Sequence, residues 1–209
     1  MNRLKIAVTK GRLLEDSLDL FEKMGLDCTA VRADTRKLIL PIENYPLDVV
    51  LSKAADVLTY VSHGVCDLGI VGKDTIMEHG GSFYEMLDLG YGKCRFALAV
   101  PEGSDFYGTY RSRVVASKYP NVTKEYFESK GMDVSVIKIE GSVELAPLVG
   151  LANGIVDIVQ TGTTLKENGL MPIETVAQVS ARLIVGTASM KLHRQEIFDF
   201  IHKIEVANR

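Results

Sequence analysis

Short apolar runs alternate with helical segments along this chain, and this alternation constrains the fold more than any other feature. Residues 4–9 alternate like a strand and end at Lys10-Gly11, after which apolar residues recur at helical spacing from Leu13 to Met24. We therefore expect an α/β fold with mostly parallel sheets. Further strands are expected at 38–42, 47–51, 68–71, 96–100, 114–116, 134–139 and 155–159, and further helices at 54–62, 122–130, 143–152 and 195–204.

A short internal repeat indicates that these elements are divided between two lobes. Segments 63–72 and 153–162 share the order helix end, Gly, Asp, strand, Gly, and the matched positions lie 90 residues apart, as Asp67 and Asp157 do. The alternative is that any helix-to-strand turn favours Gly and Asp. We expect two lobes with a central cleft at the C-terminal ends of both sheets, where open α/β folds bind ligands. The first lobe is expected at 1–93, completed by 184–209, and the second at 94–183.

Composition excludes several classes of function. The chain has 209 residues, 46% of them hydrophobic, so it can bury a core as one large domain or two small lobes. A net charge of -3 predicts no nucleic-acid or membrane partner. The start of the chain does not resemble a secretory leader and no apolar run has membrane-spanning length, so we expect a cytoplasmic protein. The three cysteines lack CxxC spacing and the four histidines lack HxH or HExxH spacing, which argues against disulfides and a histidine-built metal site.

An acid in a buried strand is the main chemical signal. Residues 155–159 are apolar except Asp157, and an unpaired carboxylate there would be costly. Asp157 therefore either caps backbone amides or meets a ligand's hydroxyl groups. The loop that follows offers a glycine, consecutive amides and threonine hydroxyls, which suit a phosphate. A Thr/Gly turn that caps a helix is the alternative. The loop consists of Thr161, Gly162, Thr163 and Thr164.

Several stretches together resemble the ATP phosphoribosyltransferase family. Residues 138–147, 151–159 and 161–170 carry the resemblance most specifically, and 9–13, 67–74 and 116–123 also match in the family's order. The resemblance implies a two-lobed, periplasmic-binding-protein-like (type II) fold. It also implies the first step of histidine biosynthesis, in which N1 of ATP attacks C1 of phosphoribosyl pyrophosphate and releases pyrophosphate with Mg²⁺ present.

The resemblance suggests roles for particular residues. Displacement at an anomeric carbon needs positioning and charge placement, with no covalent nucleophile. We assign the 5'-phosphate to Thr161, Gly162, Thr163 and Thr164, and the ribose hydroxyls to Asp157 helped by Glu140 or Glu144. Lys10 and Arg12 are candidates for the leaving pyrophosphate, which makes Lys10, Arg12 and Asp157 the catalytic candidates. Solvated side chains are the alternative for the two glutamates and for Lys10 and Arg12. Candidates for binding ATP are Lys10, Gly11, Arg32, Lys53 and Lys73, and the Mg²⁺ ligands are left unassigned.

The resemblance also implies a protein partner. Longer family members add a C-terminal histidine-binding domain, whereas this chain resembles the short form, with no regulatory domain. Short-form members depend on a regulatory subunit that resembles histidyl-tRNA synthetase, usually in a hetero-octamer. Many members carry Arg-x-Arg-Asp-x-Pro where this chain has residues 53–58, so Ala55 and Leu58 replace an arginine and a proline. Asn153 stands where aspartate is frequent, and we interpret it as a turn residue.

Two other functions fit part of this pattern. A non-catalytic two-lobed small-molecule binding protein shares the helix, Gly, Asp, strand order, although a secretory leader would be expected for it. A phosphoribosyltransferase that uses another base would share the phosphate loop. Only the wider set of matching stretches favours ATP as the acceptor.

Overall fold

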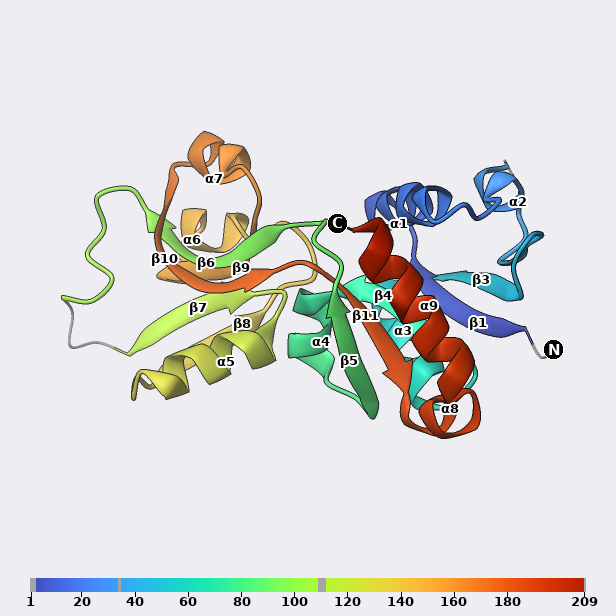
Figure 1. Ribbon diagram of the computed structural model, residues 1–209. Helices are drawn as coiled ribbons and strands as arrows, with labels where there is room; N and C mark the ends of the chain where they lie inside the picture. Colours follow the sequence, from blue (N-terminus) through green and yellow to red (C-terminus); the bar gives the residue numbers. More distant parts are fainter. Residues whose placement is uncertain (1–2, 34, 109–111, 209) are drawn as a thin grey trace. The chain divides into compact units, whose positions relative to one another are not determined.

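The computed structural model describes residues 3–33, 35–108 and 112–208 and divides the chain into two compact units (Figure 1). The first unit comprises residues 1–92 and 180–209. Its strands are β1 (Leu4–Thr9), β2 (Ile39–Ile42), β3 (Leu47–Ser52), β4 (Leu68–Gly72), β5 (Phe83–Asp88) and β11 (Ala181–Gly186), and its helices are α1 (Arg12–Lys23), α2 (Thr29–Arg32), α3 (Ala54–Ser62), α4 (Lys73–His79), α8 (Thr187–Leu192) and α9 (Arg194–Ala207).

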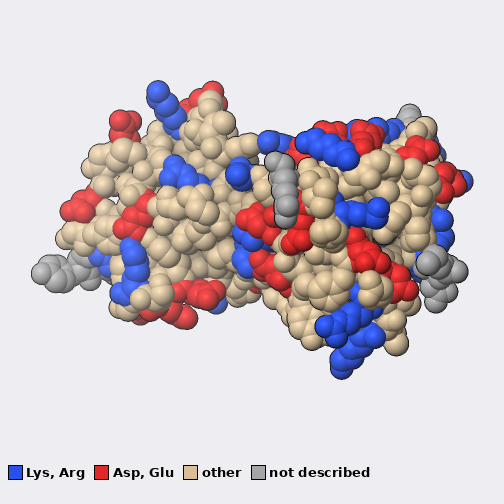
Figure 2. Space-filling model, viewed as in Figure 1, with Lys and Arg blue, Asp and Glu red and all other residues tan. Residues whose placement is uncertain are grey.

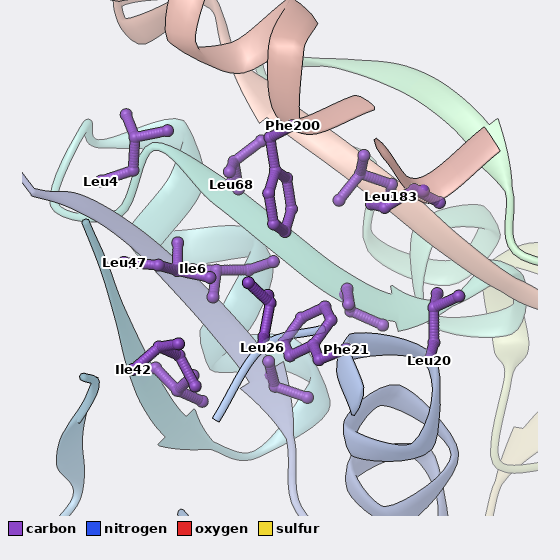
Figure 3. Packing of buried hydrophobic residues seen from close by; sticks show 14 of the residues in the cluster. Leu4, Ile6, Leu20, Phe21, Leu26, Ile42, Leu47, Leu68, Leu183 and Phe200 are labelled. Atoms are coloured by element: carbon purple, nitrogen blue, oxygen red, sulfur yellow. The ribbon is translucent and has the colours of Figure 1, made fainter. Parts of the chain in front are cut away.

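The first sheet has the strand order β2-β3-β1-β4-β11-β5, and its central strands contribute to a core cluster on each face. Because neighbouring side chains of a strand point to opposite faces, Ile6 of β1 joins the core cluster beneath α1 and α9, whereas Ala7 joins the one beneath α3. The rings of Phe21 and Phe200 meet edge to face at 5.9 Å between centroids, joining α1 to α9 (Figure 3). This packing holds the carboxyl ends of β3, β1 and β4 in fixed positions.

The second unit comprises residues 93–179 and has a smaller sheet. Its strands are β6 (Cys94–Pro101), β7 (Arg113–Ser117), β8 (Val134–Lys138), β9 (Gly154–Val159) and β10 (Leu170–Val179), in the order β10-β6-β9-β7-β8. Its helices are α5 (Pro120–Ser129), α6 (Leu145–Leu148) and α7 (Thr163–Glu167). β7 pairs in parallel with both β8 and β9, so the ends of these three strands lie along one edge.

The two units share a strand order. In the first unit β3-β1-β4-β11-β5 repeats the pairings of β8-β7-β9-β6-β10 in the second, with two parallel pairings followed by two antiparallel ones. The internal repeat pointed to this correspondence, but its spacing of 90 residues was wrong. Asp67 exchanges two hydrogen bonds with the backbone of Lys5, and Asn153 exchanges two with the backbone of Val114. The structural counterpart of Asp67 is therefore Asn153, 86 residues later, and Asp157 corresponds to Val71.

The sheets are mixed, which corrects the expectation of mostly parallel sheets. Among the described strands four pairings are parallel and five are antiparallel. The chain passes from one unit to the other on β6 and β11. β6 runs antiparallel to β9, and β11 runs antiparallel to β4. The edge strand β10 pairs with β6 and the edge strand β5 with β11, both antiparallel. The second unit ends at Val179 instead of 183, because β11 belongs wholly to the first sheet.

The predicted helix at 143–152 is also shorter than expected. It forms only α6, because Pro147 donates no backbone hydrogen bond and Gly150 adopts a positive φ of 74° just after the turn.

Figure 2 shows acidic and basic side chains interspersed over the visible face of both units. No helix among the described residues is long and apolar enough to cross a membrane.

Candidate functional site

The carboxyl ends of β8, β7 and β9 form the edge of the second sheet where the predicted phosphoribosyl site begins. Ser117 of β7 is level with Lys138 of β8 and Val156 of β9. Side chains that follow these three positions therefore emerge beside one another. We call this the acidic edge, and it comprises Lys118, Lys138, Glu140, Glu144, Asp157 and the loop from Thr161 to Thr164.

Asp157 is half-buried near the end of β9. Its Oδ1 accepts a hydrogen bond from the backbone N–H of Ile158 at 2.8 Å, and no other donor contacts the carboxylate in the described part of the chain. Burial raises the pKa of Asp157 to about 6, and the nearby charge of Glu144 adds to this, while the Ile158 hydrogen bond and Lys118 oppose it. Local capping thus uses only one oxygen, and the other remains able to accept hydrogen bonds from a ligand.

The loop after β9 exposes backbone amides and hydroxyl groups. Gly162 has φ 80° and ψ 3°, a left-handed conformation that favours glycine, and α7 begins at the next residue. The hydroxyls of Thr161 and Thr163 lie 3.1 Å apart, and Thr161 and Thr164 are both exposed. Consecutive amides and hydroxyls in such a turn can surround an anion, so phosphate binding by this loop stays a prediction.

The two predicted glutamates differ in their surroundings. Glu144 is half-buried at the start of α6, and its charge acts on Asp157, so these two carboxylates lie together. Glu140 is exposed and forms an ion pair with Lys138 at 2.7 Å, which lowers the pKa of Glu140. Of the two helpers proposed for Asp157, Glu144 is thus the one whose charge acts on Asp157.

A row of lysines marks the corresponding edge of the first sheet. Lys10 is the first residue after β1, Lys53 the first after β3 and Lys73 the first after β4, and these strands are parallel neighbours. Lys10 and Lys53 are exposed, and in the described residues neither forms an ion pair. Lys73 is half-buried and its Nζ lies 2.5 Å from Glu85. The structure therefore brings three of the predicted ATP-binding residues to one sheet edge.

The other predicted site residues of the first unit either shape the backbone or lie near carboxylates. Gly11, with φ 91°, turns the chain from β1 into α1, and Arg12 begins that helix with its Nε 3.9 Å from Asp16. Arg32 lies on α2 and forms ion pairs with three carboxylates of α1, of which Glu22 and Asp19 raise its pKa. Its partners are Glu15, Asp19 and Glu22, at 2.9, 2.5 and 2.7 Å.

Of the two replaced positions in residues 53–58, only Leu58 has a structural explanation. Leu58 is 4% exposed and packs with Val57 and Val61 in the core cluster under this helix, where a proline could not donate the helical hydrogen bond. Ala55 is exposed on the first turn of the same helix.

Sequence reasoning missed one charged group at the acidic edge. Lys118 follows β7 directly, between the ends of β8 and β9; its charge opposes the rise that burial causes in the pKa of Asp157 and adds to the effect of Lys138 in lowering the pKa of Glu140. The available signal was its position after a strand in the stretch 116–123, which the resemblance included.

The fold defines a class: an α/β protein of two similar units, with a type II periplasmic-binding-protein-like topology and with charged and polar groups after its parallel strands, where open α/β folds bind ligands. The aliphatic sulphonate binding protein SsuA from Escherichia coli has this fold, with a TM-score of 0.62 over 100% of this chain and 73% of that one. At 13% identity it shows the fold alone.

Sequence comparison specifies the family. The HisG family model, ATP phosphoribosyltransferase, matches residues 53–206. An ATP phosphoribosyltransferase of Clostridium kluyveri is 53% identical over 98% of this chain and 93% of its own length, and one of Listeria monocytogenes serotype 4a is 53% identical over 99% and 97%. The ATP phosphoribosyl transferase (HisG:HisZ) complex from Thermotoga maritima contains a chain with a TM-score of 0.83 and 32% identity, covering 98% of both chains. The chain therefore belongs to the ATP phosphoribosyltransferase family.

Proposed function

We propose that the acidic edge is the phosphoribosyl-binding site of an ATP phosphoribosyltransferase. As a member of this family, the chain transfers the 5-phosphoribosyl group of phosphoribosyl pyrophosphate to N1 of ATP and releases pyrophosphate, the first step of histidine biosynthesis. The observation that carries the assignment of the site is Asp157, a half-buried carboxylate with one oxygen uncommitted, two residues before the end of β9 and the exposed Thr/Gly loop.

The acidic edge provides groups for each part of the sugar phosphate. The amides and hydroxyls of the loop from Thr161 to Thr164 would hold the 5'-phosphate, and Asp157 would accept hydrogen bonds from the ribose hydroxyls, with Glu144 beside it. As the anomeric carbon gains positive charge in the transition state, these carboxylates would stabilise it electrostatically. Glu140 is the less favoured helper because Lys138 already neutralises it.

The lysine row provides the positive charge that polyphosphate groups need. Lys10 and Arg12 would stabilise the charge that grows on the departing pyrophosphate, and Lys53 and Lys73, with the Gly11 turn, would serve ATP. Arg32 is the weakest of the ATP-binding candidates, because three carboxylates already satisfy its guanidinium group.

Mg²⁺ is the cofactor implied by the reaction. No group of three or more His, Cys, Asp or Glu side chains suited to a metal ion occurs among the described residues. Mg²⁺ typically binds one or two carboxylates together with substrate phosphates, so Asp157 and Glu144 suit a metal that arrives with the substrate. When bound, it would neutralise charge on the pyrophosphate.

The relative from Thermotoga maritima forms a HisG:HisZ complex, which supports a regulatory partner for this chain as well. We propose a hetero-octamer with a subunit resembling histidyl-tRNA synthetase, located in the cytoplasm. Light scattering of the two co-purified subunits would measure the stoichiometry, and an absence of co-purification would contradict the assembly.

A pyrophosphate-release assay tests the activity against its alternatives. The partner subunit, phosphoribosyl pyrophosphate and Mg²⁺ are combined with ATP or with other purine and pyrimidine bases. ATP-dependent release is expected; release only with another base would indicate a different phosphoribosyltransferase, and binding without turnover would indicate a binding protein. Asp157→Asn should lower kcat/KM by roughly a hundredfold or more, because two charge-assisted hydrogen bonds contribute about 1.5 to 3 kcal/mol each. A value near that of the wild type would exclude Asp157 from the site.

A further inference from the structure

Lys73 differs from the other lysines of its row because a carboxylate holds its ammonium group. It is the first residue after β4, and its backbone N–H donates a hydrogen bond to the carbonyl of Ser180 at 2.9 Å. Its Nζ lies 2.5 Å from Oε2 of Glu85, on the edge strand β5, and the two side chains are 29% and 28% exposed. A phosphate that binds Lys73 would therefore meet an ammonium group that already has an anionic partner.

Arg182 pairs with the other oxygen of Glu85. Its strand, β11, lies between β4 and β5 (Figure 1). Nη1 of Arg182 lies 3.5 Å from Oε1 of Glu85, and Nη2 lies 3.0 Å from Oδ2 of Asp88. Asp88 is held in turn by the Ser180 hydroxyl, which donates a hydrogen bond to its Oδ1 at 2.8 Å. The two oxygens of Glu85 thus pair with different cations, of which Lys73 belongs to the lysine row.

The two cations differ in how easily they can leave Glu85. The planar guanidinium group of Arg182 is paired with two carboxylates at once, and its side chain is only 21% exposed. Lys73 carries a compact ammonium group with three donors on a flexible stem, so it can turn from one acceptor to another. If Lys73 moved to a ligand, Arg182 would still compensate the charge of Glu85, and no half-buried carboxylate would be left unpaired.

We propose that Glu85 is a positioning residue that sets the affinity of the lysine row for ATP, by competing with the phosphate groups of ATP for Lys73. This inference rests on the proposed role of Lys73 in ATP binding. In the free chain Lys73 pairs with Glu85. When ATP binds, the ammonium group exchanges this carboxylate for a phosphate, while Arg182 keeps Glu85 in place. The free energy of the ion pair between Lys73 and Glu85 is thereby subtracted from that of ATP binding.

The test measures the dissociation constant of ATP, with Mg²⁺ present, for the chain in complex with its regulatory subunit. Glu85→Gln should bind ATP about two- to fivefold more tightly than the wild type, because partly exposed ion pairs have strengths of this order. Glu85→Ala, which removes the carboxylate without supplying an amide, should shift the dissociation constant in the same direction. Isothermal titration calorimetry would measure both. A merely structural role of Glu85 would weaken ATP binding in these variants.

Two controls show whether the effect depends on Lys73. Glu43→Gln removes the same charge from an exposed position of the same unit, between β2 and β3, at the opposite end of β3 from Lys53. It should leave the dissociation constant of ATP unchanged. Lys73→Met should weaken ATP binding, and adding Glu85→Gln to it should have no further effect, because the lysine for which Glu85 competes is then absent.

Three results would count against these assignments in different ways. ATP binding by Glu85→Gln that is equal to or weaker than that of the wild type would overturn the inference, as would a gain in affinity that persists together with Lys73→Met. Unchanged ATP binding by Lys73→Met alone would exclude Lys73 from the ATP site, and the inference with it. A wild type that binds ATP but shows no ATP-dependent pyrophosphate release would instead refute the proposed function, while the binding measurements would still decide the role of Glu85.

Discussion

The variant Gly162→Ala tests whether the loop from Thr161 to Thr164 binds phosphate, once its effect on stability is measured separately from its effect on activity. Gly162 has φ 80°, and a methyl group there would meet only Val159 Cγ1 at 3.8 Å, an ordinary van der Waals contact. The cost of the substitution is therefore that of a left-handed alanine, about 1–2 kcal/mol. For a protein of this size the expected decrease in Tm is roughly 2–8 °C.

Gly131→Ala is the matched control. Gly131 has φ 66° after α5 in the same unit, and an added methyl group would meet nothing within 4 Å. The strain cost should be about the same in both variants, because each alanine would be forced into the left-handed region without a steric clash. Scanning calorimetry should therefore show similar decreases in Tm for Gly131→Ala and Gly162→Ala.

The two variants should differ in activity. If the loop amides bind the 5'-phosphate, a methyl group at position 162 would hinder the close approach of the anion to the backbone. Loss of one charge-assisted hydrogen bond, worth about 1.5–3 kcal/mol, corresponds to a decrease of roughly 10- to 100-fold in kcat/KM for phosphoribosyl pyrophosphate. Initial rates of pyrophosphate release at varied substrate would measure it. A Gly162→Ala enzyme within about twofold of Gly131→Ala would refute phosphate binding by this loop.

Three further predictions concern charged residues. Asp157→Asn should be more stable than the wild type at pH 8, by up to about 3 kcal/mol. The folded pKa of Asp157, about 6, exceeds the ordinary 3.8, so ionisation of the buried carboxyl destabilises the folded protein, in full above pH 6. The difference should disappear towards pH 4, and equal stability of the two proteins in urea at pH 8 would contradict the prediction. Lys10→Met should lower kcat more than it raises KM for ATP in steady-state kinetics, and an unchanged kcat would exclude Lys10 from stabilising the leaving group. Arg32→Gln should leave KM for ATP unchanged, because the side chain already binds three carboxylates, whereas a large rise in KM would return it to the ATP site.

The regular elements with strong hydrophobic periodicity could be predicted from the sequence. The ranges of β1 and α3 were predicted to the residue, and that of α9 to within a few residues, because each has a continuous apolar face that ends at a polar residue or turn. β5 and β10 were missed because they are edge strands, where several side chains are exposed and the apolar pattern is weak. The sheets are mixed because β6 and β11 also pair antiparallel with β9 and β4, and pairing direction leaves no mark in local periodicity.

The candidate site was predictable where the chemistry is local in the sequence. Asp157 and the loop from Thr161 to Thr164 are neighbours along the chain, so an acid in an apolar strand followed by Thr-Gly-x-Thr could be recognised. Lys118 is 39 residues away from Asp157, and only the pairing of β7 with β9 brings them to the same edge. For the same reason, the ion pairs of Arg32 with three carboxylates of α1 could not be predicted from the sequence.

The correct alignment of the two units strengthens the assignment of Asp157 to function. Asp67 and Asn153 perform the scaffold's turn-capping role in the two units, with the same pair of backbone hydrogen bonds. Asp157 therefore has no counterpart in that role; its equivalent in the first unit is Val71, which is fully buried in the core cluster under α3. A scaffold that is stable with valine at this position does not require a carboxylate there, and burial disfavours its ionised form. Because the shared strand order needs no acid at this position, the energetic cost of Asp157 favours a role in binding a ligand over a role in the fold.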